Sequence, residues 1–426
     1  MQIIKYPAKE QWEEILKRPS MDFASLFDKV KITLDNVREN GDKALTELTK
    51  EFDNVDITQF EVTNAEIEEA EKLVSLELKQ AIEMARRNIW KFHSEQLNEF
   101  SEIQTSPGVY CWQKTVPIEK VGLYIPGGSA PLFSTVLMLG IPAQIAECKE
   151  VILCSPPDSN GKIHPAVLYA ARVAGIHRIF KVGGAQAIAA MAYGTESIPK
   201  VYKIFGPGNQ YVTAAKQLVS LNDVAIDMPA GPSEVEVIAD ETANPVYVAS
   251  DLLSQAEHGP DSQAILVTTS EPLIEKVLEQ IETQIEVLPR KEIARKSLNN
   301  SKIILVESID EAISITNEYA PEHLIISTRS YMVVAEHIVN AGSVFLGHMS
   351  PESAGDYASG TNHTLPTNGF AKAYSGVNLD HYFKKITFQQ LTPEGLTNLS
   401  NAIILMAENE GLQAHSNAVK LRLNMR

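Results

Sequence analysis

Basic side chains are scarce in this sequence of 426 residues, which contains 37 Lys and Arg against 54 Asp and Glu and carries a formal charge of −17. Binding to nucleic acid or to an anionic membrane surface depends on clustered Lys and Arg that neutralise phosphates. The basic run near the end of the chain, Lys420, Arg422 and Arg426, is too sparse to reverse this balance. The charge therefore argues against nucleic acid and membranes as partners.

Cysteines and long apolar runs are also rare. The three cysteines, Cys111, Cys148 and Cys154, show no C-x-x-C spacing, so we expect buried small side chains rather than disulfides or a zinc knuckle. The most apolar stretch, residues 123–145, is interrupted by Gly and Pro at six positions and is a poor membrane span. Residues 1–14 lack the apolar core of a signal peptide. We therefore expect a soluble, cytoplasmic protein.

Hydrophobic residues make up 44% of the sequence, which is enough to build more than one core. Two helical patterns, at 23–52 and 65–92, precede a change at residue 120 to short β-branched runs that alternate with helical patterns. This alternation predicts βαβ units and parallel sheets. The expected strands are 121–125, 151–154, 179–182, 203–205 and 224–226 in a first series, and 235–239, 264–268, 303–306, 324–327 and 343–346 in a second.

The predicted fold is α/β, with two Rossmann-like doubly wound domains of mostly parallel sheets, N-terminal helices and a small helical C-terminal tail. The expected divisions are residues 1–119 as a helical region that leads into the first α/β domain, 120–233 as an inserted Rossmann-like domain, 234–380 as the continuation of the first α/β domain, and 381–426 as the tail. The tail, with helices expected at 393–409 and 414–423, is predicted to have no sheet of its own.

The stretch from Ser254 to Pro260 concentrates polar chemistry at the end of an expected helix, residues 245–256. Gln255 and His258 lie three residues apart, so they share one helix face and offer two metal-capable atoms. The alternative is ordinary polarity at a helix end, where His is favoured by the helix dipole. Helical geometry turns Glu257 away from this face, which indicates a supporting or surface residue.

A second pair, Glu322 and His323, comes directly before an expected strand. A carboxylate beside an imidazole can serve as an acid/base pair, because His titrates near neutral pH. A capping Glu beside a core His explains the same pattern equally well.

A polar stretch at 350–369 is too long to be an idle connection in a compact domain, and it contains Asp356 and His363. Glu410 and His415 are the remaining candidates, in the tail. Each of these residues alone is more often solvent-facing. Together with Gln255 and His258, they form a nitrogen and oxygen ligand set that suits zinc or another divalent ion.

Three glycine-containing turns follow strands of the first series, at 126–129, 183–186 and 206–209. Each opens a helix, where free backbone N–H groups attract anions such as a dinucleotide pyrophosphate. None matches G-x-G-x-x-G, and glycine is common in such turns for steric reasons. The three together favour a nucleotide or another phosphate-bearing ligand.

Six segments carry a resemblance to a known family: VGLYIPGG at 121–128, IFGPGN at 204–209, DMPAGPSE at 227–234, LSQAEHGPDS at 253–262, PEH at 321–323, and 350–363 with SPESAGD at its start. In these segments, and over nearly its whole length, the chain resembles the histidinol dehydrogenases. The resemblance implies a zinc-dependent, NAD-linked oxidation of L-histidinol to L-histidine through L-histidinaldehyde, in histidine biosynthesis.

The resemblance also assigns residues. It implies a homodimer with one zinc ion per subunit and active sites shared between subunits, to which the partner contributes Glu410 and His415. It implies an acid/base pair in Glu322 and His323. The implied metal ligands are Gln255, His258, Asp356 and His415. The implied substrate contacts are Ser233, Gln255, His258, His323, Asp356, His363, Glu410 and His415, and the implied NAD contacts are Tyr124, Gln186 and Asn209.

Two other functions compete with this one. A related zinc dehydrogenase for another small chelating alcohol, such as a sulfonated diol, is disfavoured by Glu410 and His363, which suit a cationic, nitrogen-rich substrate. A metal- or nucleotide-binding protein without catalysis is disfavoured because Glu322 and His323 are both present.

Overall fold

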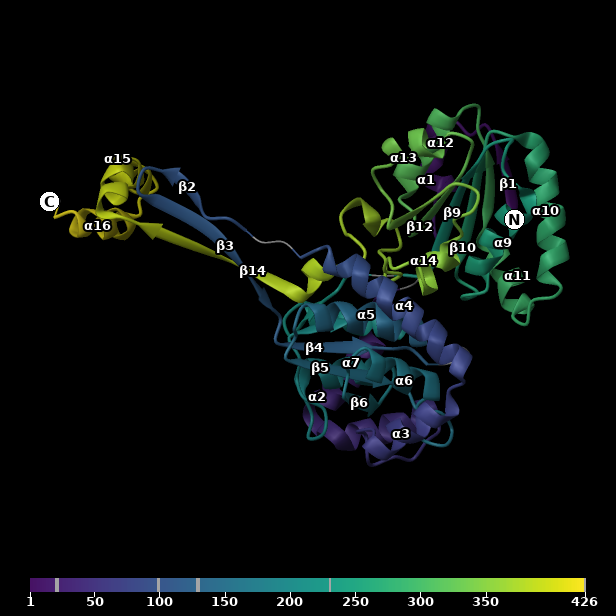
Figure 1. Cartoon of the computed structure of the whole chain (residues 1–426), viewed down its shortest axis with the longest axis horizontal. Coiled ribbons are helices and arrows are strands. Elements are labelled where there is room, and N and C mark those ends of the chain that lie inside the picture. The colour runs from purple at the N-terminus through teal and green to yellow at the C-terminus, as the bar shows by residue number, and fades with distance from the viewer. Residues whose placement is uncertain (20–22, 98–99, 128–130, 230, 425–426) are drawn as a thin grey trace.

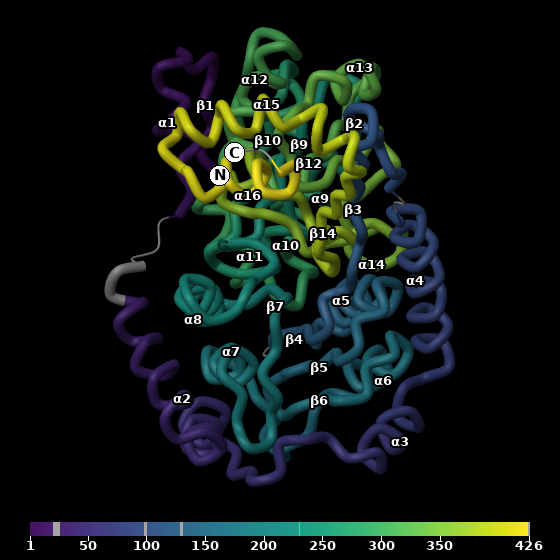
Figure 2. The backbone as a smooth tube through the Cα atoms, turned by 90° about the vertical axis from the view of Figure 1, so that its left-hand side faces the viewer, coloured from purple at the N-terminus to yellow at the C-terminus, as the bar shows by residue number. Residues whose placement is uncertain are grey.

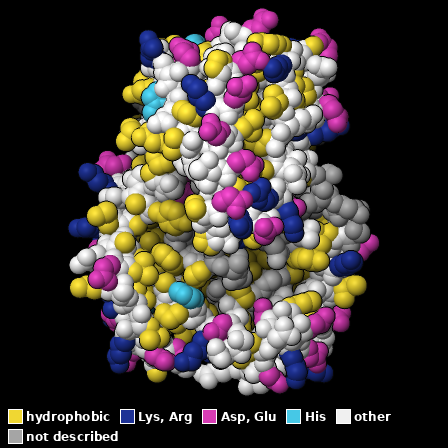
Figure 3. Space-filling model, turned by 90° about the vertical axis from the view of Figure 1, so that its right-hand side faces the viewer, with side chains coloured by type: hydrophobic (Ala, Val, Ile, Leu, Met, Phe, Trp, Pro, Cys, Tyr) yellow, Lys and Arg dark blue, Asp and Glu magenta, His cyan; other side chains and the backbone are white. Residues whose placement is uncertain are grey.

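The computed structural model describes residues 1–19, 23–97, 100–127, 131–229 and 231–424. The chain forms two α/β lobes and a narrow arm that ends in a pair of helices (Figure 1). Each lobe contains a parallel sheet between helices, which confirms the predicted α/β fold class. On the face drawn in Figure 3, Lys and Arg side chains are interspersed with Asp and Glu.

The first lobe is built on a five-stranded parallel sheet in the order β6-β5-β4-β7-β8. Neighbouring residues of a strand enter different cores: Leu123 of β4 packs in one cluster and Tyr124 in the other. Both faces of the sheet are therefore covered, as parallel sheets require. The strands are β4 (Lys120–Tyr124), β5 (Glu150–Ser155), β6 (Arg178–Lys181), β7 (Lys203–Phe205) and β8 (Ala225–Ile226).

The helices between these strands lie on opposite sides of the sheet, α7 and α8 on one and α5 and α6 on the other (Figure 2). The N-terminal helix α2 packs against α7 and α8, while α3 packs against α6 and α4 against α5. The bounds are α2 (Phe23–Asp53), α3 (Asn64–Leu73), α4 (Leu76–Ser94), α5 (Phe133–Ile145), α6 (Pro165–Val173), α7 (Gly184–Tyr193) and α8 (Gln210–Ser220).

A single helix at 65–92 was expected where the structure has α3 and α4. The break falls at Val74, and Ser75 caps α4 by accepting a hydrogen bond from the Leu78 backbone N–H at 3.2 Å. Thr63 and Glu66 form a capping box at the start of α3. The apolar periodicity runs on through the break, so only the cap at Ser75 marks it.

The second lobe is built on a six-stranded parallel sheet in the order β1-β11-β10-β9-β12-β13. Its last five strands repeat the connectivity of the first sheet, although the sequence shows no repeat. The strands are β1 (Gln2–Lys5), β9 (Glu234–Ala239), β10 (Gln263–Thr268), β11 (Lys302–Leu305), β12 (His323–Ser327) and β13 (Ser343–Leu346). The edge strand β1 was not predicted, because residues 1–100 were expected to be helical.

Helices cover both faces of this sheet as well. Residues of α9 (Pro245–Ala256), α10 (Glu271–Ile285) and α11 (Lys291–Asn300) share one core. Residues of α12 (Ile309–Tyr319) and α13 (Tyr331–Glu336) share the other core with Trp12 of α1 (Trp12–Ile15). Among the described residues, no helix is long and apolar enough to cross a membrane.

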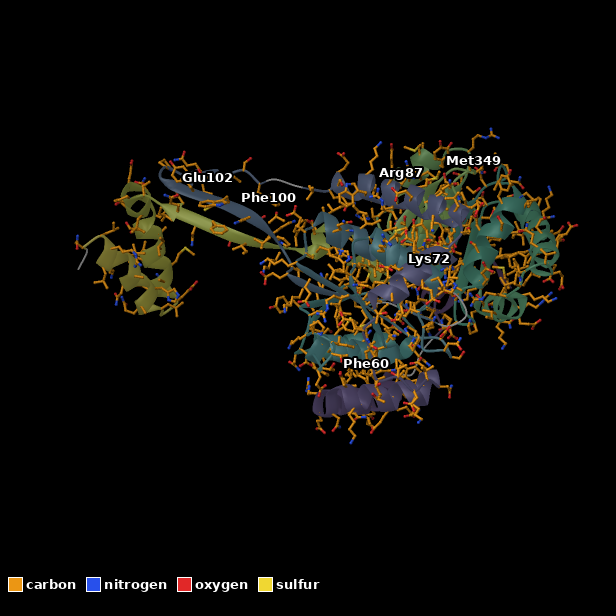
Figure 4. All side chains as sticks on the ribbon, turned by 60° about the horizontal axis from the view of Figure 1, so that its bottom comes forward. Phe60, Lys72, Arg87, Phe100, Glu102 and Met349 are labelled. Carbon is orange, nitrogen blue, oxygen red and sulfur yellow. The ribbon has the colours of Figure 1, made fainter. Side chains whose placement is uncertain are left out.

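The arm is an antiparallel ribbon of three strands, β2 (Ile103–Ser106), β3 (Val109–Pro117) and β14 (Phe383–Leu391). It carries α15 (Pro393–Asn409) and α16 (Gln413–Arg422) at its tip. Phe100 and Glu102 mark the arm in Figure 4, well separated from Met349 beside the second lobe. The tail was predicted to have no sheet of its own; the structure gives it one strand, β14, which pairs along its whole length with β3 from outside the tail.

The three cysteines are free, as expected, but only Cys154 is buried. Cys111 and Cys148 are partly exposed, which contradicts the expectation that all three are core residues.

Candidate active site

The candidate residues converge where the two lobes meet, at the amino ends of β9 and β12. These strands are neighbours in the middle of the six-stranded sheet, at the point where its strand order reverses. A cavity of about 410 Å³ lies there and takes its lining from both lobes. From the first lobe it takes residues 206–210, and from the second it takes Ser233, His258, Glu322 and His363. Ligands of open α/β sheets usually bind outside the carboxyl ends of the strands, whereas the candidate residues of this lobe lie at the amino ends of β9 and β12.

His323 is the first residue of β12 and is 4% exposed. Its Nδ1 donates to the backbone carbonyl of Glu234 at 3.2 Å and lies 3.6 Å from Glu322 Oε2. Its Nε2 lies 3.3 Å from Asp356 Oδ1, within ion-pair range, but makes no hydrogen bond. Burial lowers the pKa of His323, and the facing carboxylates of Glu322 and Asp356 outweigh burial, so the pKa is raised well above its ordinary value.

Glu322 is held equally firmly. Its Oε2 accepts a hydrogen bond from the Glu234 backbone N–H at 2.8 Å and a longer one from Gln255 Nε2 at 3.4 Å. The backbone of Glu234 thus holds both members of the pair, Glu322 through its N–H and His323 through its carbonyl. The structure brings together the acid/base pair that the sequence suggested.

Oxygen atoms without hydrogen-bond partners gather beside this pair. Gln255 is fully buried and its Oε1 is unpartnered, as is Oδ1 of Asp356. Side-chain ligand atoms of His258, Glu352 and Asp356 all lie within 4.8 Å of one another. Buried oxygen atoms without partners are costly unless a cation is bound. A neutral oxygen, an imidazole and carboxylates therefore fit zinc or a similar divalent ion.

Glu352 is the residue that the sequence argument missed. A short helix, α14 (Glu352–Tyr357), occupies part of the stretch that was expected to be a loop. Glu352 and Asp356 are four residues apart on it and share one face, and this spacing is the signal that would have found Glu352. Burial raises the pKa of Glu352 to about 8, whereas His323 keeps the pKa of Asp356 below its ordinary value in spite of burial. Glu257 does not belong to this group, as expected.

His363 links the two lobes at the cavity wall. Its Nδ1 donates to the backbone carbonyl of Asp356 at 2.9 Å, and Thr135 Oγ1 of α5 lies 2.9 Å from its Nε2. With Nδ1 as the donor, Nε2 accepts from the Thr135 hydroxyl. Burial lowers the pKa of His363, which favours this neutral form. Ser233, on the same wall, is partly buried.

A larger cavity, of about 1060 Å³, lies at the carboxyl ends of the first sheet, and Tyr124, Gln186 and Asn209 all line it. The Tyr124 hydroxyl accepts a hydrogen bond from the Gly184 backbone N–H at 3.1 Å. Asn209 caps α8 by accepting from the backbone N–H groups of residues 211 and 212. Asn209 also lines the smaller cavity, so the two cavities adjoin. Gly128 and Ser129, of the first glycine turn, lie outside the described residues.

Glu410 and His415 do not join the site in this chain. Glu410 follows the end of α15, His415 lies in α16, and both are exposed. The tip of the arm that carries them points away from the two lobes (Figure 1).

Comparisons with known proteins identify the family of this chain. A family described as histidinol dehydrogenase matches residues 16–423. A histidinol dehydrogenase of Bacteroides fragilis (strain YCH46) is 67% identical over 423 residues, which are 99% of each chain. A histidinol dehydrogenase of Bacteroides thetaiotaomicron is 65% identical, and the match covers 100% of this chain and 99% of that protein.

A crystal structure of histidinol dehydrogenase from Elizabethkingia anophelis superposes with a TM-score of 0.97 at 55% identity, over 100% of this chain and 98% of the other. Sequence and structure therefore agree over the full length of the described lobes and arm. The chain belongs to the histidinol dehydrogenase family of oxidoreductases.

Proposed function

We propose that this chain acts in the cytoplasm as a zinc-dependent, NAD-linked enzyme that oxidises L-histidinol to L-histidine through L-histidinaldehyde. The observation that carries the proposal is the buried Glu322–His323 pair, which lies against the unpartnered oxygen atoms of Gln255 and Asp356. Glu322 lines a cavity of substrate size, and this cavity adjoins, at Asn209, another that is large enough for a dinucleotide.

Gln255, His258 and Asp356, with His415 of the partner subunit, are the residues we assign to the zinc ion. When bound, the ion would supply orientation for L-histidinol, whose nitrogen atoms suit zinc. Tyr124, Gln186 and Asn209 would hold NAD in the larger cavity, and NAD would supply the hydride acceptor.

His323 is suited to take the proton of the alcohol in the first oxidation. Because Nδ1 donates to the Glu234 carbonyl, Nε2 is the basic nitrogen, and it makes no hydrogen bond. The nearby carboxylates of Glu322 and Asp356 stabilise the imidazolium that forms. As the hydroxyl proton moves to Nε2, a hydride leaves the alcohol carbon and the aldehyde results.

Glu322 is assigned to the second oxidation. Its carboxylate takes a proton from water as the water oxygen adds to the aldehyde carbon, and the hydrate then gives up the second hydride. Glu322 lines the same cavity as His363 and Ser233, which we assign to substrate contacts.

Step-specific assays test this division of labour. His323→Asn should lower the rate of L-histidinol oxidation about 100-fold or more, the range for loss of a general base. Glu322→Gln should slow L-histidinaldehyde oxidation selectively. The assignment fails if His323→Asn leaves both steps unchanged, or if Glu322→Gln slows both steps equally.

The position of the tail supports a homodimer. Glu410 and His415 lie on an arm that points away from this chain's own site, so we assign both residues to the site of a partner subunit. His415→Ala and His323→Asn chains should each be inactive as homodimers. Verified heterodimers of the two should recover one working site, and no recovery would contradict shared sites.

A further inference from the structure

Helix α5 contains a proline in its interior, Pro142, and this proline deprives one backbone carbonyl of its helical partner. In an α-helix each carbonyl accepts a hydrogen bond from the N–H group four residues later. Pro142 has no N–H, so the carbonyl of Met138, in the buried middle of α5, lacks its helical donor. A buried carbonyl without a donor is costly, so a donor from another part of the chain is expected.

The donor comes from the segment that also carries His363. Asn362 is buried, and its Nδ2 donates to the Met138 carbonyl at 2.6 Å. The same Nδ2 lies 3.5 Å from Nε2 of His93, on α4, and burial lowers the pKa of His93, which favours a neutral ring that accepts there. Asn362 Oδ1 accepts from the Thr364 backbone N–H at 3.0 Å. Asn362 is therefore fastened to two helices of the first lobe.

Asn362 is the residue before His363, and both residues are held by α5. Thr135, whose hydroxyl donates to His363 Nε2, lies three residues before Met138 and so shares its face of the helix. Two consecutive residues thus bind a hydroxyl and a carbonyl of one helix, which lies on the side of the first lobe next to the second lobe (Figure 1). The place of His363 on the cavity wall depends on both bonds.

We propose that Asn362 is a positioning residue for the oxidation of L-histidinol: through the carbonyl that Pro142 frees, it holds His363 where the substrate binds. The proposal rests on the proposed function, in which His363 contacts L-histidinol, and adds the device that sets this contact. Asn362 lies outside the lining of the cavity and acts through its neighbour. Because α5 belongs to the first lobe, the same bond fixes a substrate contact relative to the lobe that carries the larger cavity.

Four variants of the full-length protein separate positioning from stability. Asn362→Ala removes the donor, whereas Asn362→Asp keeps the size and the acceptor for the Thr364 N–H but, as a carboxylate, cannot donate to Met138. Pro142→Ala gives α5 its own N–H group for the Met138 carbonyl. The double variant, Asn362→Ala with Pro142→Ala, therefore satisfies the carbonyl without the link to Asn362. Tm is measured for each, with kcat and the KM values for L-histidinol and NAD.

Asn362→Ala and Asn362→Asp should raise the KM for L-histidinol about 5- to 10-fold, the effect of one lost hydrogen bond, with a smaller change in kcat and the wild-type KM for NAD. Asn362→Ala should also lower Tm by roughly 2–12 °C, because the Met138 carbonyl loses its donor. The double variant should recover most of the loss in Tm but keep the raised KM. Pro142→Ala alone is the matched control and should keep the wild-type KM, because a carbonyl can accept from two donors.

The His363 ring is also observed directly, by NMR of protein with ¹³C-labelled histidine rings and with His363→Gln to assign the signals. Wild type should show the form protonated at Nδ1, and the signals should shift or broaden in Asn362→Ala and in the double variant.

The inference is overturned if the KM of the double variant returns to the wild-type value together with Tm, since Asn362 would then only satisfy the carbonyl. It is also overturned if the His363 signals of Asn362→Ala match those of wild type. Wild type that does not oxidise L-histidinol would refute the proposed function, and the His363 signals would still decide whether Asn362 positions this ring.

Discussion

Arg18 is expected to be indispensable to the second lobe, although it lies outside the candidate active site. Its guanidinium donates to both carboxylate oxygens of Glu234, at 2.5 and 2.9 Å, and to the backbone carbonyl of Tyr319 at 2.7 Å. It also stacks 3.9 Å from the centre of the Tyr319 ring. The exposed fractions of the Arg18 and Glu234 side chains are 16% and 3%.

Replacing Arg18 with Met keeps the aliphatic stem and removes the charge, which leaves Glu234 buried without its partner. Such a loss costs about 3–5 kcal/mol. Burial already raises the pKa of Glu234, even with Arg18 in place. Without Arg18 the pKa rises further above its unfolded value, so protonation relieves the strain at low pH and the loss of stability grows as pH increases.

The assay is thermal and denaturant unfolding of the metal-free protein at pH 5 and pH 8. We expect Arg18→Met to lower the Tm of the second lobe by roughly 6–20 °C at pH 8, at 2–4 °C per kcal/mol, and by less at pH 5. Arg18→Met with Glu234→Gln should recover most of the loss. The reasoning would be refuted if the free energy of unfolding of Arg18→Met stayed within about 1 kcal/mol of the wild-type value at both pH values.

Three smaller changes test other parts of the structure. Burial raises the pKa of Glu236 to about 8. The contribution of Glu236 to stability is therefore complete below its unfolded pKa and is lost as pH rises through 8. We expect Glu236→Gln to flatten the fall in Tm between pH 5.5 and 8.5. Tyr124→Phe removes the acceptor for the Gly184 N–H, so the KM for NAD should rise about 5-fold, about 1 kcal/mol, with kcat nearly unchanged, and an unchanged KM would count against the assignment. Thr135→Val leaves His363 Nε2 without a donor, so the KM for L-histidinol should rise by a similar factor, while Thr135→Ser should behave as wild type.

Most of the fold was predictable because its signals are local. The helix at 245–256 was predicted with the bounds that the structure shows. In the structure Asn244 caps it, Pro245 occupies its first position, and Gly259-Pro260 prevent its continuation. The buried parallel strands were recognisable as short β-branched runs between helices.

The elements that were missed lack such signals. Strand β14 is exposed along most of its length, so it shows none of the apolar alternation of a half-buried strand. Strand β1 is short, lies at the edge of its sheet and pairs with β11, about 300 residues away in sequence. Pairing over such a distance leaves no trace in the local pattern. The helix α14 has only 6 residues, beneath the length at which periodicity is visible.

In the candidate site, too, the local features were predictable and the contacts between distant segments were not. Gln255 with His258, and Glu322 with His323, were recognisable as local pairs, but their meeting with Asp356 depends on the packing of α9, β12 and α14. Local patterns left the alternatives open for both pairs, and only the family resemblance joined these residues into one site. Glu352 lies four residues before Asp356, but this spacing has meaning only on a helix, and Glu352 became a candidate when the structure showed the helix α14 and its unpartnered oxygen.

The most direct test of the central claim is the yield of NADH from a limiting amount of L-histidinol, with excess NAD. The account predicts two NADH for each L-histidinol, no NADH after the metal is removed with a chelator, and recovery when Zn²⁺ is added back. One NADH for each L-histidinol, or a full yield from the metal-free protein, would contradict it.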